Sequence, residues 1–441
     1  MNNLLELKGR FEQASRSTNG FSAPNLPKGQ SVSVSKLLDI LKNLKDLMEY
    51  WKGQTLLPGI LISVHYIKVA SKSNRIQARL GNNSNRPNSS IVGAKFSLDT
   101  SPKHIITHYL SRDIVNESIL KLTDSINILN QQFNGKLDHD TINKINQKTI
   151  PYTHKTIYKT NFLKVIVDAY YVEKFDIYIE DAMFEQDAII TIYKTDVKTT
   201  QLLEKIGINI LSSRIMDETT ILLRPDELEI LKTKAPFLIS MAVSDLSEIT
   251  KDDFQFIDDS IITIDSPKNE PIIGVIDTLF DERVYFSEWV EYSNMLSIDI
   301  PVSESDKEHG TAVSSIIVDG PTFNPYLDDG CGRFRVRHFG VASGKSFNSF
   351  TILRNISEIV AANKDIKVWN LSLGSKLNIN PNFISPEAAI LDKIQFENDV
   401  IFVIAGTNLS FVETITRPIG APADSINSIV VNSVDKDNQP S

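Results

Sequence analysis

Residues 272–281 read Ile-Ile-Gly-Val-Ile-Asp-Thr-Leu-Phe-Asp, and residues 308–318 read Glu-His-Gly-Thr-Ala-Val-Ser-Ser-Ile-Ile-Val. The first stretch predicts a buried strand that ends in Asp277, and the second predicts an apolar helix that begins at His309. A carboxylate beside a histidine fixes the imidazole tautomer and stabilises its cation, while the other ring nitrogen acts as a general base. The separation of 32 residues leaves room for an excursion of the chain and a return to the same sheet edge.

Apolar runs alternate with helical segments from here onward. Val and Ile runs that do not alternate with polar residues indicate strands buried on both faces, which favours a parallel α/β sheet. Ligands bind at the carboxyl ends of the strands in such sheets, where Asp277 is expected. Strands are predicted at 272–276, 336–341, 368–372, 400–404 and 429–434, and helices near 309–318, 347–363 and 386–397.

Two further motifs belong to the same segment. Asn370-Leu-Ser372-Leu373-Gly374 is an extended run whose edge could pair with a substrate backbone by strand addition. Residues 403–408 read Val-Ile-Ala-Gly-Thr-Asn and lead from a buried strand to Asn408. A side-chain amide in that loop could donate to a developing oxyanion.

The order and spacing of these motifs resemble the subtilisin-like serine proteases (subtilases), over about residues 270–441. In that family the triad runs Asp, His, Ser along the chain. The resemblance implies that Asp277 and His309 are the triad aspartate and histidine, and that Asn408 is the oxyanion-hole asparagine. It also implies that Ser372, Leu373 and Gly374 form the substrate-binding strand. Residues 419–423 and 429–438 resemble the segments that follow in the family.

The sequence departs from the family pattern at several positions. Leu279 replaces a glycine, Ala312 replaces a second histidine, and Thr407 is inserted before Asn408. The family nucleophile lies in Gly-Thr-Ser, which occurs nowhere in residues 1–441, and Ser441 is given no catalytic role. We therefore expect a serine-type endopeptidase whose catalytic domain is truncated before its serine, so that this chain is inactive. The alternative is an inactive pseudoprotease that binds a partner.

The sequence upstream divides into a basic α/β module at 1–160, a second module at 161–246 and an acidic linker at 247–270, with the catalytic segment at 271–441. Within 1–160, Ser33 or Ser35 is expected to cap a helix that runs to about Trp51. Within 188–243 the pattern β-α-β-β-α-β, with a second strand at 208–213, predicts a ferredoxin-like unit. Subtilase propeptides have this topology, so the unit is interpreted either as propeptide-like or as an unrelated scaffold.

Charge is distributed unevenly along the chain. The net charge is −9, but residues 1–112 carry 16 Lys and Arg against 6 Asp and Glu. This pattern is typical of a solvated basic face, or of a surface for an acidic partner such as nucleic acid or a protein. No zinc pattern and no RNP-like aromatic run supports nucleic acid. The resemblance also connects the chain with cytoplasmic bacterial subtilases encoded beside AAA-type ATPases in phage defence, which suggests an ATPase partner.

Other sequence features bear on location and cofactors. A single cysteine, Cys331, and an N-terminus unlike a secretion signal favour the reducing cytosol. The most apolar window, residues 56–70, is too short and polar for a membrane span. A protein or peptide substrate is expected, and no cofactor. Acidic loops such as Asp328-Asp329 lack the ligand spacing of a calcium site, and calcium dependence is left open.

Overall fold

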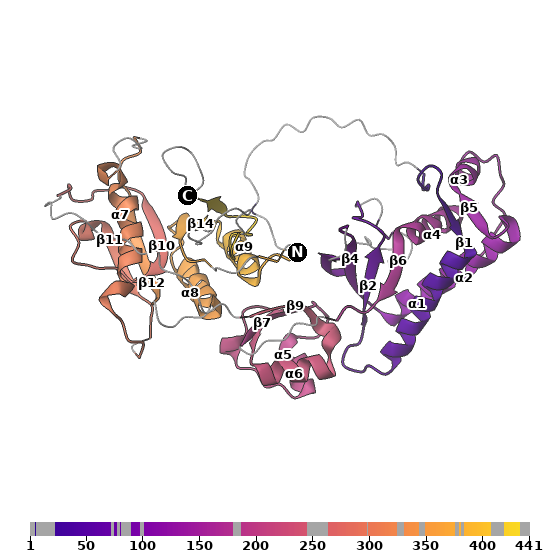
Figure 1. Cartoon of the computed structure of the whole chain (residues 1–441), viewed down its shortest axis with the longest axis horizontal. Coiled ribbons are helices and arrows are strands. Elements are labelled where there is room, and N and C mark those ends of the chain that lie inside the picture. The colour runs from indigo at the N-terminus through magenta and orange to yellow at the C-terminus, as the bar shows by residue number, and fades with distance from the viewer. Residues whose placement is uncertain are drawn as a thin grey trace. The chain divides into compact units, whose positions relative to one another are not determined.

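The computed structural model divides into two compact units, one formed mainly by residues 10–185 and 190–242 and the other mainly by residues 243–441 (Figure 1). The residues that the structure describes are 5, 23–71, 75–76, 80, 90–97, 101–179, 187–244, 263–297, 299–323, 330–343, 349–374, 379–380, 383–406 and 419–432.

The first unit begins with a capped helix, α1 (Val34–Lys52). The Ser33 hydroxyl accepts from the Lys36 backbone N–H at 3.3 Å, so Ser33 rather than Ser35 is the N-cap. This bond satisfies one of the amide groups that a helix start leaves without a partner. The buried face of α1 carries Leu37, Ile40, Leu41, Leu44, Leu47 and Trp51.

A four-stranded antiparallel sheet with the order β3-β4-β2-β6 forms the centre of this unit. Residues 161–176, which the sequence places in the second module, contribute most of α4 and all of β6, and β6 pairs directly with β2. The strands are β2 (Ile60–Tyr66), β3 (Ile91–Phe96), β4 (His104–Leu110) and β6 (Val172–Asp176). A short ladder joins β1 (Ser31–Ser33) to β5 (Lys136–Asp138), and the remaining helices are α2 (Arg112–Gln132), α3 (His139–Asn146) and α4 (Lys159–Tyr171).

A second sheet in this unit has three strands in the order β8-β7-β9. The strand predicted at 208–213 does not form: the chain is irregular there and ends in a 3₁₀ turn, Ser212–Arg214. The ferredoxin-like prediction is therefore wrong in its second strand. Leu211 is 68% exposed and of this stretch only Ile208 is buried, so the apolar residues that suggested a strand have no core face to occupy. The elements are β7 (Ala188–Ile192), α5 (Thr199–Ile206), β8 (Thr220–Leu223), α6 (Pro225–Lys234) and β9 (Ile239–Ser244).

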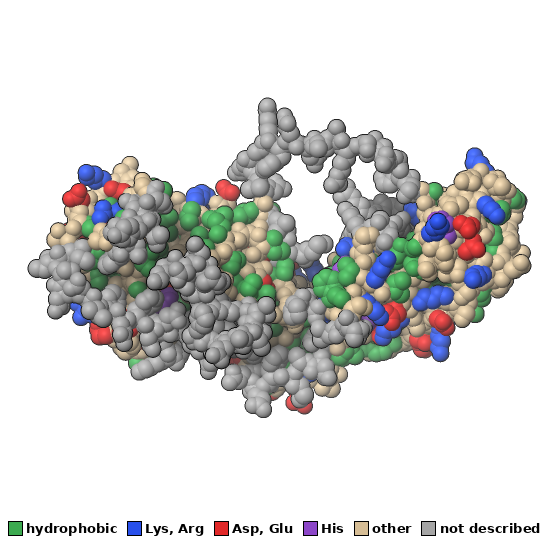
Figure 2. Space-filling model, turned by 45° about the horizontal axis from the view of Figure 1, so that its top comes forward, with side chains coloured by type: hydrophobic (Ala, Val, Ile, Leu, Met, Phe, Trp, Pro, Cys, Tyr) green, Lys and Arg blue, Asp and Glu red, His purple; other side chains and the backbone are tan. Residues whose placement is uncertain are grey.

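The Lys and Arg side chains of the first unit are interspersed with Asp and Glu on the face seen in Figure 2. Among the described residues of both units, no helix is long and apolar enough to cross a membrane.

The second unit is built on a six-stranded sheet with the order β11-β12-β10-β13-β14-β15, in which every pairing is parallel. All five predicted strands form, and the prediction of a parallel α/β sheet is confirmed. The strands are β10 (Ile272–Thr278), β11 (Val290–Asn294), β12 (Arg335–Ala342), β13 (Val368–Leu371), β14 (Ile401–Ala405) and β15 (Ile429–Val431). The helices are α7 (Glu308–Phe323), kinked at Asp319, α8 (Ser349–Ala362) and α9 (Pro386–Asn398).

The sequence missed β11, the edge strand that pairs with β12. Its residues, Val-Glu-Tyr-Ser-Asn, are partly or fully exposed and contain no apolar run, so the pattern of a buried parallel strand is missing. Beside it, one core cluster packs around β10, β12 and α7. Its buried members are Val275, Phe280, Phe286, Trp289, Val318 and Val336.

Candidate active site

Asp277 lies at the carboxyl end of the central strand β10, and its side chain is fully buried. The pairing with β12 shifts by one residue between Asp277 and Thr278. Such irregularities change the direction in which side chains point at the ends of strands. The Asp277 Oδ1 atom accepts from the backbone N–H of Thr278 at 2.6 Å. The Asp277 carboxylate is therefore held in part by a hydrogen bond from within its own strand.

His309 is the second residue of α7, and its Nδ1 lies 2.6 Å from Asp277 Oδ1. Because an ionised carboxylate only accepts hydrogen bonds, Nδ1 carries the proton and donates. The side chain of His309 is 15% exposed, so the pair is largely screened from water. The structure thus brings together the two residues that the sequence placed 32 positions apart.

The second carboxylate oxygen of Asp277, Oδ2, is buried and has no hydrogen-bond partner in the part of the chain that the structure describes. A buried carboxylate with one oxygen that lacks a hydrogen bond favours a neighbouring cation. Protonation of His309 would place that cation against Asp277. The arrangement suits a histidine that gains and then returns a proton.

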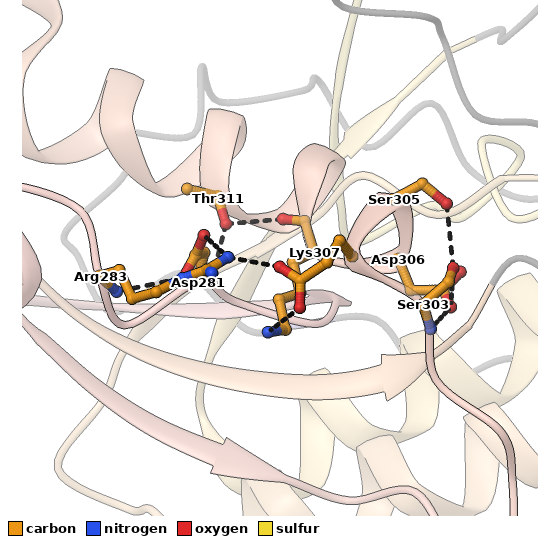
Figure 3. A network of polar contacts seen from close by, with 8 residues as sticks. Asp281, Arg283, Ser303, Ser305, Asp306, Lys307 and Thr311 are labelled. Atoms are coloured by element: carbon orange, nitrogen blue, oxygen red, sulfur yellow. Dashed lines mark hydrogen bonds and ion pairs between the residues drawn. The ribbon is translucent and has the colours of Figure 1, made fainter.

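Polar contacts join the two ends of the segment between Asp277 and His309 (Figure 3). Arg283 donates to both carboxylate oxygens of Asp281, each at 2.7 Å, and also pairs with Glu304. The Asp281 backbone N–H donates to Thr311 Oγ1 at 2.9 Å, which ties the loop after β10 to the first turn of α7. Ion pairs of exposed side chains contribute little stability, so the backbone tie is the more important contact for holding the two ends together.

A second tie runs through the turn before α7. The Leu279 backbone N–H donates to the Asp306 carbonyl at 3.0 Å. The buried Asp306 carboxylate in turn accepts from the Ser303 backbone N–H and hydroxyl, both at 2.8 Å. The residues just after Asp277 are therefore fixed to the residues just before His309.

Sequence reasoning missed a second histidine, His338 in β12, which is fully buried behind the pair. Its Nε2 lies 2.8 Å from the Thr278 carbonyl oxygen and its Nδ1 lies 2.9 Å from Ser314 Oγ. Burial lowers the pKa of the His338 imidazole. One feature of the sequence could have indicated this residue: a histidine lies within the predicted strand sequence Val-Arg-His-Phe-Gly-Val. A buried histidine needs hydrogen-bond partners, so its place in a buried strand predicts polar contacts with neighbouring elements.

The predicted substrate strand follows β13 at the same sheet edge. Ile276 is paired with Leu371, so Ser372 continues β13 where Asp277 continues β10. The Asn370 side-chain amide donates to Ser372 Oγ at 2.8 Å. Leu373 is buried and Gly374 is half-buried. An apolar pocket adjoins them, lined also by Ser349, Ile352, Leu353, Ile356, Leu371, Glu387, Ala421 and Pro422.

Some predicted residues lie outside the described residues. Asn408 and the preceding Thr407 are among them, as are Asp328 and Asp329 of the acidic loop. Within the described part of the chain, no group of three or more His, Cys, Asp or Glu side chains is arranged to hold a metal ion.

Residues 268–441 match the sequence profile of the Subtilase family. This segment is a subtilase domain. Its parallel sheet, with Asp277 and His309 at the carboxyl edge, is a subtilisin-like α/β fold. No curated protein matches the chain.

Several solved protease structures are similar at low identity. The epidermin leader peptide processing serine protease EpiP from Staphylococcus aureus is 15% identical, with 58% of this chain and 71% of that chain covered and a TM-score of 0.36. The prenylagaramide maturation protease PagA is 18% identical, with 39% and 56% covered and a TM-score of 0.28. The patellamide maturation protease PatA is 18% identical, with 39% and 59% covered and a TM-score of 0.29. The match thus spans less than two thirds of the length of PagA and PatA.

Proposed function

We propose that the subtilase domain supplies the aspartate and the histidine of an Asp-His-Ser triad for serine-type peptide-bond hydrolysis. The observation that carries the proposal is the 2.6 Å contact between His309 Nδ1 and Asp277 Oδ1 at the carboxyl edge of the sheet. Residues 1–441 contain no Gly-Thr-Ser, so the proposal places the nucleophile outside them. On this basis residues 1–441 alone do not form an acyl-enzyme.

In the proposed reaction, His309 Nε2 accepts the proton of the serine hydroxyl as the serine oxygen attacks the carbonyl carbon of the substrate. Asp277 keeps the proton on Nδ1 and stabilises the imidazolium that forms. The imidazolium then donates its Nε2 proton to the leaving amine. Asn408 is proposed to donate to the oxyanion, a contribution of about 3 kcal/mol in a dry site.

The proposed substrate is an extended peptide segment of a protein. Its backbone would pair with Ser372, Leu373 and Gly374 as an added strand. The adjoining pocket is lined mainly by apolar side chains from α8 and β13, and it favours an apolar substrate side chain there. No metal or cofactor takes part in this scheme.

Replacement of the triad aspartate tests the proposal in the product of the complete gene. Asp277→Asn should lower kcat for peptide hydrolysis by about 10⁴-fold, because an amide no longer holds His309 in the Nδ1–H tautomer. Asp365→Asn is the matched control, since Asp365 is an exposed carboxylate bonded to Arg337 and its variant should retain full activity. Equal activity of Asp277→Asn and the control would exclude a triad role for Asp277.

The second candidate is a pseudoprotease that keeps the peptide groove and binds a partner. It requires no serine nucleophile, so it is compatible with the lack of Gly-Thr-Ser in residues 1–441. The gene sequence beyond codon 441 separates the two candidates, because only the protease proposal requires a Gly-Thr-Ser there. In this second proposal the basic residues 1–112 recruit the partner, with an ATPase as one candidate and nucleic acid as another.

A cytosolic location is part of both proposals. Nucleic-acid binding through residues 1–112 would weaken steeply with rising salt, because Lys and Arg release counterions from phosphates on binding.

A further inference from the structure

His338 links three parts of the subtilase domain with its two ring nitrogens. It lies in β12, next to β10, and it contacts α7 through Ser314. Both ring nitrogens are within hydrogen-bond distance of fixed partners, Thr278 O at 2.8 Å and Ser314 Oγ at 2.9 Å. Because a carbonyl oxygen can only accept, the Nε2 atom carries the proton and Nδ1 accepts from the Ser314 hydroxyl.

Thr278, the residue after Asp277, connects His338 with the proposed catalytic pair through hydrogen bonds. Its N–H donates to Asp277 Oδ1, its Oγ1 accepts from the Gly310 N–H at 2.9 Å, and its carbonyl accepts from His338. Gly310 follows His309 directly. One residue is thus bonded to the proposed catalytic carboxylate, to the helix turn that carries the proposed catalytic histidine, and to His338.

We propose that His338 is a positioning residue for the Asp277–His309 pair. Its Nε2–H bond to the Thr278 carbonyl fixes the turn after Asp277 and, through Thr278, the start of α7. The inference rests on the proposed function, because it concerns how the proposed catalytic pair is held. His338 itself does not contact Asp277 Oδ1 or His309 Nδ1 through any of these bonds.

The surroundings of His338 keep its imidazole neutral and in one orientation. Its ring lies 5.6 Å, centre to centre, from the rings of both Phe280 and Tyr292. Burial lowers the pKa of the His338 imidazole, which keeps the Nδ1 lone pair available to Ser314. The ring edge also lies close to the helix start, since a Cβ on Gly310 would come within 2.8 Å of His338 Cε1.

Two substitutions distinguish the role of the His338 Nε2 hydrogen bond from the role of the packing of the His338 ring. In His338→Gln the side-chain NH₂ takes a position close to Nε2 and can still donate to Thr278 O. In His338→Asn the shorter side chain places its oxygen close to Nδ1, keeps an acceptor for Ser314 and loses the donor to Thr278. Both variants remove the ring and its aromatic contacts, so the loss of those contacts alone does not distinguish them.

The readout is the NMR signal of the His309 Nδ1 proton in residues 1–441, which needs no nucleophile. A proton held in a 2.6 Å hydrogen bond to a carboxylate and screened from water gives a strongly downfield, slowly exchanging signal. We expect this signal in the unsubstituted chain and in His338→Gln, and its loss in His338→Asn. In the product of the complete gene, kcat should fall by about 10²-fold in His338→Asn with KM unchanged, because misplacement affects the transition state.

Each result has a defined meaning. Retention of the signal in both variants, or equal loss in both with equal loss of stability, would overturn the positioning role and leave the proposed function standing. Absence of the signal from the unsubstituted chain would overturn the proposed function and this inference together. If His338→Asn does not fold, Ser314→Ala provides the second test: it removes only the bond to Nδ1, so the signal should persist, and its loss would contradict the assignment of the Nε2 bond as the positioning contact.

Discussion

Asp277, His309 and His338 are buried to different degrees, and their environments suit different tasks. Asp277 is fully buried and bonded to His309, whose side chain stays partly exposed at the sheet edge. His338 is fully buried with both nitrogens bonded. A histidine that transfers protons needs access to substrate, whereas one that holds a turn needs fixed partners. In the proposed function His309 has the first task, and in the inference drawn above His338 has the second.

The burial of His338 and His108 leads to a prediction of how the free energy of unfolding depends on pH. Burial lowers the pKa of His338, and burial followed by the nearby Arg75 charge lowers the pKa of His108 to about 4. In the unfolded chain both imidazoles titrate with a pKa of about 6.5. Below that pH the unfolded state binds more protons than the folded state, so the free energy of unfolding falls as pH falls. For His108 the loss spans the window from about 6.5 down to about 4.

Thermal unfolding from pH 7.5 to 4 measures this dependence. Carboxylates also titrate at the low end, so the informative quantity is the difference between the unsubstituted chain and His108→Gln. The variant, which has no imidazole at this position, should lose less stability over the window. Parallel pH profiles for the two chains would contradict the prediction.

The contact between helix α7 and strand β10 sets the geometry of the site. Gly310 lies where the first turn of the helix meets the end of the strand. A Cβ at this position would lie 2.7 Å from the carbonyl oxygens of both Thr278 and Leu279. Backbone atoms cannot move aside as a flexible side chain can, so the strand and the helix could not keep this spacing.

Gly310→Ala should therefore destabilise the subtilase domain by about 1–3 kcal/mol, the usual cost of overpacking, and weaken the His309 Nδ1 proton signal. Gly320→Ala, in the same helix, is the control, because a Cβ there would meet only Ile316 Cγ2 at 3.9 Å. Chemical denaturation of both variants measures the difference. Equal stability of the two would show that the helix and strand do not need the close approach.

The core elements were predictable from sequence because apolar side chains are concentrated in them. Apolar runs predicted β10, β12, β13, β14 and β15, and the non-alternating Val and Ile runs were clearest in β10, β14 and β15. Capping predicted the start of α1. The edge strand β11 gave no such signal, since its side chains are largely exposed. Residues 208–213 show the opposite error, where an apolar run without a core face forms no strand.

The site could be predicted only in part, for a physical reason. Asp277 and His309 stand in recognisable local motifs. His338 acts through partners on two other elements, Thr278 and Ser314, and their proximity follows from the sheet order and the docking of α7. No local pattern in the sequence encodes that proximity.

The chain combines two compact units with different compositions. The subtilase domain, residues 268–441, covers well under half of the chain, and the basic excess lies at residues 1–112 in the first unit. The proposed catalytic pair, Asp277 and His309, belongs to the second unit. In the pseudoprotease proposal, the basic residues 1–112 of the first unit are the candidate for partner recruitment.

In the proposed function, Asp277 and His309 activate a serine that lies outside residues 1–441. Labelling with a fluorophosphonate, with the modified residue located by mass spectrometry, tests it most directly. The product of the complete gene should be labelled at one serine in a Gly-Thr-Ser context, His309→Ala should abolish this labelling, and residues 1–441 alone should remain unlabelled. Labelling of a serine within residues 1–441, or labelling of the complete product that survives His309→Ala, would contradict the claim.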